Sequence, residues 1–166
     1  MLQKEYDRLS AVQYAHKWAY TRNPKYYNFD LLGGDCTNFI SQCIFVGSKI
    51  MNYDKNNGWY YRSLNDRSPS WTGVEFLYDF LVRNKSVGPF GKDVNQNEIE
   101  IGDIIQLSFN GIIYGHNLIV VDIQTTESLL GIKVAAHTND TGNKAVGTYQ
   151  FSKIRFIHIQ GVRKWK

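Results

Sequence analysis

Hydrophobic residues near the start of the chain recur at three- and four-residue steps, the spacing of one helical face. Between residues 6 and 21 these positions are Ala11, Tyr14, Ala15, Trp18 and Ala19. Asp7 or Ser10 is placed to cap the start of this helix. Asn23-Pro24 ends it, because a residue before proline avoids the helical conformation.

A second helix is predicted to begin at Cys36. Its apolar face comprises Cys36, Phe39, Ile40, Cys43, Ile44 and Gly47. Residues 48–70 are rich in Asn, Ser and Tyr and show no period, which predicts a long loop. Thr72-Gly73-Val74-Glu75 has the form of a capping box, so a third helix is expected to run to about Asn84.

The second half of the chain has the patterns of strands. Residues 99–107 alternate broadly and predict a strand pair or one bent strand, and Asn110-Gly111 is a hairpin signal. Further strands are expected at 118–123 and 132–137, and one or two more at 149–162. Helices followed by antiparallel strands indicate an α+β fold, with N-terminal helices packed on an antiparallel β-sheet.

Composition places the chain among ordinary globular proteins, at 43% hydrophobic and 20% charged residues, and its 166 residues predict a single domain spanning 1–166. The net charge is +4, but the basic residues are scattered, which argues against a nucleic-acid partner. No apolar run approaches the ~20 residues of a membrane span. The N-terminus leads into an amphipathic helix rather than a signal sequence, so we expect either a cytoplasmic protein or one module of a longer secreted chain. We expect a monomer.

The two cysteines, Cys36 and Cys43, lie seven residues apart on one predicted helix. At ~1.5 Å per residue their separation is roughly 10 Å, too far for a disulfide. The spacing also differs from the Cys-x2–4-Cys pairs of structural zinc sites. We therefore expect neither a disulfide nor a metal, and no cofactor.

Cys36 is the first candidate for chemistry. Gly33-Gly34 allows a tight turn, and Asp35 is a good helix N-cap. A cysteine in the first turn of a helix meets partial positive charge, which lowers a thiol pKa, and unpaired N–H groups, which can hold an oxyanion. The alternative interpretation is a small buried residue packed beneath a loop.

A cysteine nucleophile needs a base, and four histidines are available. His16 and His158 are expected at the surface. His116 opens a core strand, and His137 ends the next one. If these strands are antiparallel neighbours, the two histidines lie side by side, and His137, Asn139 or Asp140 could orient the His116 ring.

The segment from Gly33 to Cys43 closely resembles the signature of the putative amidase domain family of firmicute bacteria. That family is similar to the NlpC-like and CHAP cell-wall hydrolases of the papain-like superfamily. The resemblance continues at Trp71-Thr72-Gly73-Val74, at Gly102-Asp103, at His116 and at His137-Thr138-Asn139-Asp140. Thr37 stands where the NlpC-like pattern has serine.

The resemblance implies a papain-like, NlpC-like core and amide-bond hydrolysis by a Cys36 thiolate paired with the His116 imidazolium. His137 is the implied third member, with Asn139 and Asp140 as alternatives. Tyr27, or else Tyr26, together with Asp35 would line the oxyanion or substrate site. Peptidoglycan stem peptides or another peptide-like amide are the implied substrates. Four aromatic residues border the predicted long loop and could either line a groove or pack structurally: Trp59, Tyr60, Tyr61 and Trp71. A non-catalytic peptide- or wall-binding module and a thiol acyltransferase are the alternatives.

Overall fold

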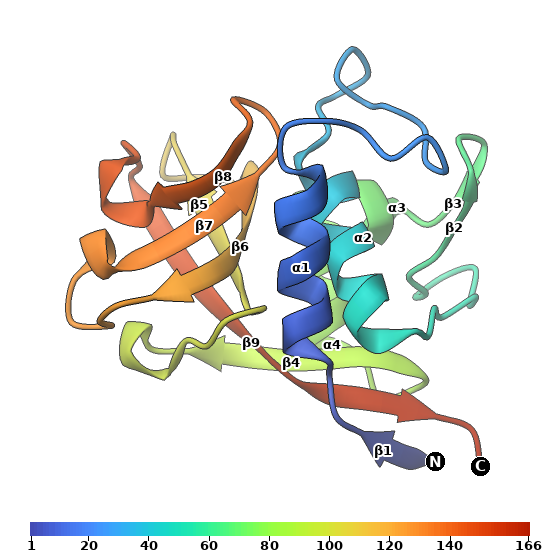
Figure 1. The fold of residues 1–166 in the computed structure, drawn as a ribbon. Helices are drawn as coiled ribbons and strands as arrows, with labels where there is room; N and C mark the ends of the chain where they lie inside the picture. The colour runs from blue at the N-terminus through green and yellow to red at the C-terminus, as the bar shows by residue number, and fades with distance from the viewer.

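The computed structural model describes residues 1–166. Four helices lie mostly in the first half, and nine strands follow or flank them (Figure 1). The helices are α1 (Arg8–Trp18), α2 (Cys36–Ser48), α3 (Pro69–Thr72) and α4 (Val74–Arg83). The strands are β1 (Leu2–Lys4), β2 (Tyr61–Ser63), β3 (Asp66–Arg67), β4 (Gly88–Val94), β5 (Ile104–Ser108), β6 (His116–Ile123), β7 (Ile132–Ala136), β8 (Thr141–Ala145) and β9 (Lys153–Lys164).

The main sheet is antiparallel and has the strand order β1-β9-β5-β6-β7-β8, with β4 also paired to β9. The long strand β9 holds the sheet together, because its first part pairs with β5 and its later part with β4 and β1. The pairing of β1 with the end of β9 brings the two chain termini side by side (Figure 1). The expected α+β class, with helices against an antiparallel sheet, is confirmed.

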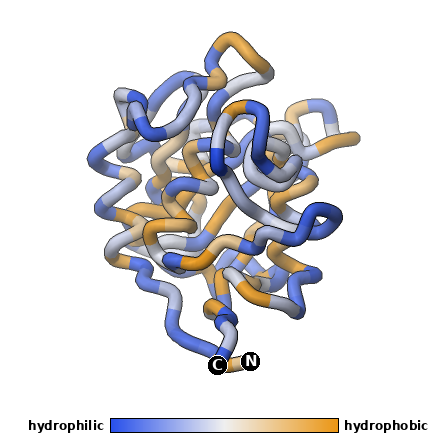
Figure 2. The backbone as a smooth tube through the Cα atoms, turned by 90° about the vertical axis from the view of Figure 1, so that its right-hand side faces the viewer, coloured by the Kyte–Doolittle hydropathy of each residue, from blue (hydrophilic) through white to orange (hydrophobic).

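Each face of the sheet has its own apolar core. The larger core joins α1, α2 and α4 to one face, where Ile119 of β6 and Ala135 of β7 contribute. The smaller core lies on the other face and contains Leu107, Leu118 and Val134. Successive residues of a strand point to opposite faces, so β6 contributes to both cores. In Figure 2 hydrophobic stretches run through the interior of the molecule.

The two first helices form where the sequence predicts them. Asp7 caps α1, and its carboxylate accepts a hydrogen bond from the Ser10 backbone N–H at 3.0 Å. α2 begins at Cys36 and ends at Ser48, and the C-cap residue Lys49 adopts a left-handed conformation with φ 62°. The positions of Asp7 and Cys36 therefore agree with the predictions from periodicity and capping.

The region predicted as a long loop is largely structured. It contains the β2–β3 hairpin and a bridge between Asn52 and Trp59, and α3 starts within its last residues. Trp59 and Trp71 are fully buried and pack against each other in the larger core, with ring centroids 4.9 Å apart and ring planes tilted by 33°. They are core residues, so the alternative that they line a substrate groove is wrong.

Other boundaries also differ from the predictions. α4 begins after Gly73, and no side chain caps it, so the proposed capping box at Thr72 does not form. Residues 99–107 give only one strand, β5, after a turn. β1, β4 and β8 were not predicted, because β4 (Gly-Pro-Phe-Gly) and β8 (Thr-Gly-Asn-Lys) lack alternating apolar residues. None of the helices has the length and apolar character of a membrane-spanning segment.

At Gly47, α2 packs closely against the segment before α1. A Cβ at Gly47 would collide with the Tyr6 ring and lie 2.9 Å from the Asp7 carbonyl oxygen. Alanine in a helix normally stabilises relative to glycine, by about 1 kcal/mol. Here overpacking should reverse the sign, and we expect Gly47→Ala to lower the free energy of unfolding by about 2 kcal/mol in urea denaturation.

Gly115→Ala is the matched control, because a Cβ there meets nothing within 4 Å. Its free energy of unfolding should stay within about 0.5 kcal/mol of wild type. Equal stability of Gly47→Ala and wild type would contradict the observed packing of α2.

Candidate active site

The turn before α2 is built from glycines in a conformation that other residues rarely adopt. Gly33 and Gly34 have φ of 84° and 94°. The Phe29 carbonyl accepts hydrogen bonds from the N–H groups of Leu32 and Gly34, at 2.9 and 3.0 Å, and closes the turn. The left-handed backbone is what requires glycine here, and it delivers Cys36 as the first residue of α2.

Asp35 stands at the N-cap position of α2, but its side chain does not cap the helix. One carboxylate oxygen accepts from the Phe29 backbone N–H and from the Asn38 side chain, both at 2.9 Å. The other lies 2.5 Å from Nδ1 of His137. Asp35 is only 1% exposed, so it is a buried carboxylate that is fully hydrogen-bonded.

His137 joins three elements of the fold. Its Nδ1 meets Asp35 before α2, and its Nε2 lies 2.7 Å from the carbonyl oxygen of Trp18, the last residue of α1. Its ring stacks on Phe39, with centroids 3.9 Å apart. His137 itself follows the end of β7, so the side chain fastens α1, α2 and the sheet together.

The turn after His137 is strained and charged. Thr138 and Asn139 have positive φ, 67° and 56°, which is unfavourable for a β-branched residue such as threonine. The Arg22 guanidinium binds both carboxylate oxygens of Asp140, at 2.9 and 3.0 Å, and also pairs with Asp30. Asp140 is therefore held by Arg22, and Asn139 makes no side-chain hydrogen bond.

The thiol of Cys36 is buried between α2 and the start of β6, and the residue is 9% exposed. Burial raises the pKa of Cys36, and the negative charge of Asp35 adds to this rise. Hydrogen bonds from the Asn117 backbone N–H and from the hydroxyl and N–H of Thr37 act in the opposite direction without cancelling it. The expected lowering of the pKa of Cys36 at the helix start is thus outweighed by desolvation.

His116 is the first residue of β6 and pairs with Leu107 of β5. Its ring lies near Phe109 and Tyr149, with centroids 6.1 and 6.0 Å away, on the side of the smaller core. The next residue, Asn117, points to the opposite face and donates to the Thr37 hydroxyl oxygen of α2 at 3.0 Å. No hydrogen bond joins His116 to Cys36, although the thiol contacts the backbone one residue away.

Burial lowers the pKa of His116 to about 4, and the nearby charge of Lys144 contributes to the lowering. Both Cys36 and His116 are consequently neutral at pH 7, so the resting site does not hold the thiolate–imidazolium pair implied by the resemblance. Nor does His137 contact His116, because both nitrogens of His137 are engaged by Asp35 and Trp18.

The two tyrosines upstream of Cys36 have different environments. Tyr26 stacks on Trp71, with ring centroids 5.9 Å apart, and burial raises its pKa to about 12. Tyr27 is 42% exposed, its N–H donates to the Tyr61 hydroxyl, and its carbonyl accepts from the Asn38 side chain. Of the two, only Tyr27 presents its ring to solvent near α2.

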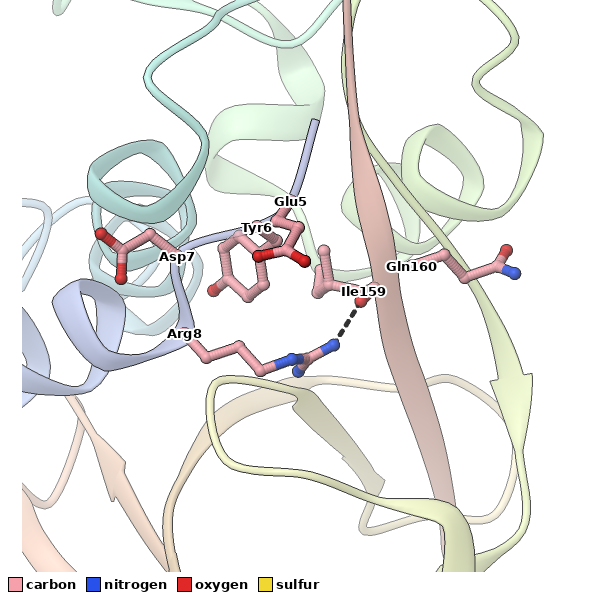
Figure 3. Close-up of a pocket in the computed structure, with 6 residues that line it drawn as sticks. All are labelled: Glu5, Tyr6, Asp7, Arg8, Ile159 and Gln160. Atoms are coloured by element: carbon pink, nitrogen blue, oxygen red, sulfur yellow. Dashed lines mark hydrogen bonds between the residues drawn. The ribbon is translucent and has the colours of Figure 1, made fainter. Parts of the chain in front are cut away.

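Two surface pockets are lined by charged side chains. One beside Asp35 and His137 holds no room for a water molecule. The other is a cavity of about 630 Å³ that Cys36 does not line; its lining residues are Glu5, Tyr6, Asp7, Arg8, Ile159 and Gln160 (Figure 3). There the Arg8 guanidinium turns toward β9 and donates to the Ile159 carbonyl at 2.5 Å.

Close to Arg8, the side chains of Glu100, Asp103 and His158 form the one cluster with metal-ligand chemistry. Arg8 already supplies a cation there, 2.6 Å from Asp103, and His158 lies 2.8 Å from the same carboxylate. His158 is thus a hydrogen-bond partner of Asp103 rather than the simple surface residue expected from the sequence.

Sequence reasoning missed Asn117 and Arg22. Arg22 had no signal, because its partners Asp30 and Asp140 are distant from one another in sequence. Asn117 had one: a polar residue between His116 and the apolar run of β6 falls on the face that packs against α2.

The burial of His116 predicts a specific dependence of stability on pH. The unfolded chain binds a proton at this residue below its ordinary pKa of 6.5, but the folded protein does so only below about 4. Stability should therefore fall as pH decreases from 6.5 to 4. We expect His116→Gln to reduce this slope by up to about 1.4 kcal/mol per pH unit, measured by urea unfolding at several pH values.

Exposed His16 provides the control, and His16→Gln should follow the wild-type slope. Parallel curves for wild type and His116→Gln between pH 4 and 6.5 would show that His116 is not a buried neutral histidine.

Comparison with known proteins places the chain in a family. The family described as putative amidase domain matches residues 5–160. The uncharacterized protein YhbB of Bacillus subtilis (strain 168) is 38% identical over 120 residues, which cover 70% of this chain. The matched region is 37% of the length of that relative. No solved structure matches. The family description indicates amide-bond hydrolysis, and the chain belongs to the putative amidase domain family.

Proposed function

We propose that the chain is a cysteine-dependent amide hydrolase on a papain-like core, with Cys36 as nucleophile and His116 as general base and acid. One observation carries this proposal: the Thr37 hydroxyl oxygen of α2 lies 3.7 Å from the Cys36 sulfur and accepts a hydrogen bond at 3.0 Å from the Asn117 side chain of β6. The neighbouring residue is His116, so nucleophile and base stand on adjoining ends of a helix and a strand.

The helix start also supplies an oxyanion site. The Cys36 backbone N–H has no hydrogen-bond partner, as expected in the first turn of a helix. When the sulfur bonds to the carbonyl carbon, the former carbonyl oxygen carries the negative charge and would lie beside this N–H. One such donor is worth about 3 kcal/mol to the transition state in other hydrolases. Tyr27, with its exposed ring, is the better placed of the two tyrosines to line the entrance.

Because both groups are neutral at rest, the reaction starts with proton transfer rather than with a ready-made thiolate. The His116 ring, which rests beside Phe109 and Tyr149, must swing toward the sulfur for this step. His116 takes the thiol proton as the sulfur attacks the amide carbonyl carbon. It gives that proton to the nitrogen of the leaving amine as the C–N bond breaks. It then takes a proton from the water that attacks the thioester, and passes it to the sulfur as the C–S bond breaks.

His137 has a positioning role in this proposal, because its two nitrogens are already used to hold Asp35 and Trp18. Asp140 is bound by Arg22, and Asn139 has no fixed partner, so neither orients His116. Asp35 acts with His137 in fixing the turn before Cys36 and does not itself face the substrate.

The surroundings suit a peptide-like substrate with apolar side chains. Leu31 and Leu32, in the loop before α2, are 101% and 52% exposed. Ile112 and Ile113, in the loop before His116, are 83% and 58% exposed. The loop before α2 is at the top of the molecule in Figures 1 and 2 and has a hydrophobic tip. Peptidoglycan stem peptides, which contain alanine, are the first substrates to test.

A non-catalytic binding module is the second candidate, and one observation favours it: the His116 ring and the Cys36 thiol are not hydrogen-bonded. The test is digestion of purified peptidoglycan by wild type, Cys36→Ala and Cys43→Ala, with mass spectrometry of the soluble products. We expect wild type and Cys43→Ala to release peptides with new amino termini, and Cys36→Ala to lose at least about a thousandfold in rate.

Equal release by Cys36→Ala would refute the proposed nucleophile. Binding of peptidoglycan without any release by wild type would favour the binding module. Incorporation of an added amine in place of water would identify an acyltransferase instead.

A further inference from the structure

A relay of hydrogen-bonded polar side chains leads from the surface to Cys36. It consists of Arg155, Gln106, Asn117 and Thr37. Arg155 of β9 donates from Nε and Nη2 to Oε1 of Gln106 in β5, at 2.8 and 2.6 Å. Gln106 donates to Oδ1 of Asn117 in β6 at 2.8 Å. Asn117 donates to Thr37 Oγ1 of α2 at 3.0 Å, and this oxygen lies 3.7 Å from the Cys36 sulfur.

These side chains lie where an apolar core would otherwise be expected. Gln106 and Asn117 are completely buried, and Thr37 is 1% exposed. They sit between α2 and the sheet, among the residues of the larger core. None of the buried polar atoms of these side chains lacks a hydrogen-bond partner, so the network is satisfied and its geometry is rigid.

Arg155, at the surface end of the relay, fixes which group donates in each of the hydrogen bonds that follow. Arginine has no acceptor, so the Gln106 oxygen must face Arg155. The Gln106 nitrogen then faces Asn117, and it also donates to the Val74 carbonyl, an acceptor only, at 3.0 Å. The Asn117 oxygen is used by Gln106, so its nitrogen faces Thr37. The Thr37 oxygen therefore accepts, and its own proton is left free to point at the Cys36 sulfur.

The arginine that sets this direction is itself held in place. Its guanidinium lies between the rings of Tyr78 and Tyr114, at 3.5 and 3.9 Å from their centroids, and pairs with Glu75 at 3.3 Å. Glu75 also accepts from the backbone N–H of Tyr114, in the loop that leads to His116. The same anchor thus fixes both the relay and the approach to the proposed base.

We propose that Arg155, Gln106 and Asn117 are positioning residues that make the Thr37 hydroxyl a permanent donor to the Cys36 sulfur. This inference rests on the proposed role of Cys36 as nucleophile. A sulfur that accepts this bond is stabilised as it becomes the thiolate, because hydrogen bonds to a charged acceptor are stronger than those to a neutral one. The charged group acting against it is Asp35, whose carboxylate disfavours the thiolate.

The relay predicts that a substitution at Gln106, which is separated from Cys36 by Asn117 and Thr37, alters the reactivity of the Cys36 thiol. In Gln106→Glu the carboxylate still accepts from Arg155 but cannot donate to Asn117. The Asn117 amide must then turn over, and the Thr37 hydroxyl donates to Asn117 instead of to the sulfur. Thr37→Val removes the donor directly with little change of shape. In both variants we expect the pKa of Cys36 to rise by about one, which slows alkylation at pH 7 about tenfold.

The measurement is the rate of iodoacetamide labelling of Cys36 against pH, followed by peptide mass spectrometry, which distinguishes Cys36 from Cys43. Thr37→Ser keeps the donor, and Ser41→Ala removes a buried hydroxyl of the same helix that bonds Trp71 and Trp59 instead. Both controls should label within about twofold of wild type. Circular dichroism confirms that each variant is folded, and Thr37→Val decides the matter if Gln106→Glu does not fold.

A wild-type pKa of Cys36 in Thr37→Val and in any folded Gln106→Glu protein would overturn the relay. The labelling requires no substrate, so it is independent of the proposed function. Slower labelling in these variants without peptidoglycan cleavage by wild type would support the relay and refute the proposed hydrolase activity. Cleavage by wild type with unchanged labelling in the variants would support the hydrolase activity and refute the relay.

Discussion

The contact between the Asp35 carboxylate and the His137 ring is the interaction on which the site depends. It links the turn before α2 to the end of β7, and the other nitrogen of the same ring links to the end of α1. Removing one member of a buried, hydrogen-bonded charged pair costs several kcal/mol, so this contact contributes strongly to holding the three elements together. The exposure of both residues, 1% each, makes this constraint strict.

A consequence of this contact is that Asp35 is not available to cap α2. The first N–H groups of the helix therefore remain free to face the Cys36 sulfur and a developing oxyanion. The cost is that Cys36 lies deep enough for desolvation to raise its pKa. Donors at the sulfur offset this burial, and the amide relay from Arg155 fixes one of them in place. Stability and reactivity are thus set by the same few buried polar groups.

Local signals in the sequence were sufficient for α1, α2 and β6, because periodicity, a cap and a glycine turn are properties of neighbouring residues. They predicted Cys36 at a helix start and His116 at a strand start. They failed where long-range packing decides. The segment after α2 is structured because Trp59 and Trp71 are buried by distant elements. Asp35 binds His137, 102 residues away, instead of capping the backbone of its own helix.

The most direct test of the account is a double-mutant cycle on Asp35 and His137, using Asp35→Asn, His137→Phe and the combined variant. Phenylalanine preserves the stacking on Phe39 and removes the ring nitrogens. The free energies of unfolding from urea denaturation at pH 7 give the coupling between the two side chains. The account predicts a coupling of about 3 kcal/mol, with the double variant destabilised by much less than the sum of the single variants. Additive effects, with a coupling below about 0.5 kcal/mol, would contradict it.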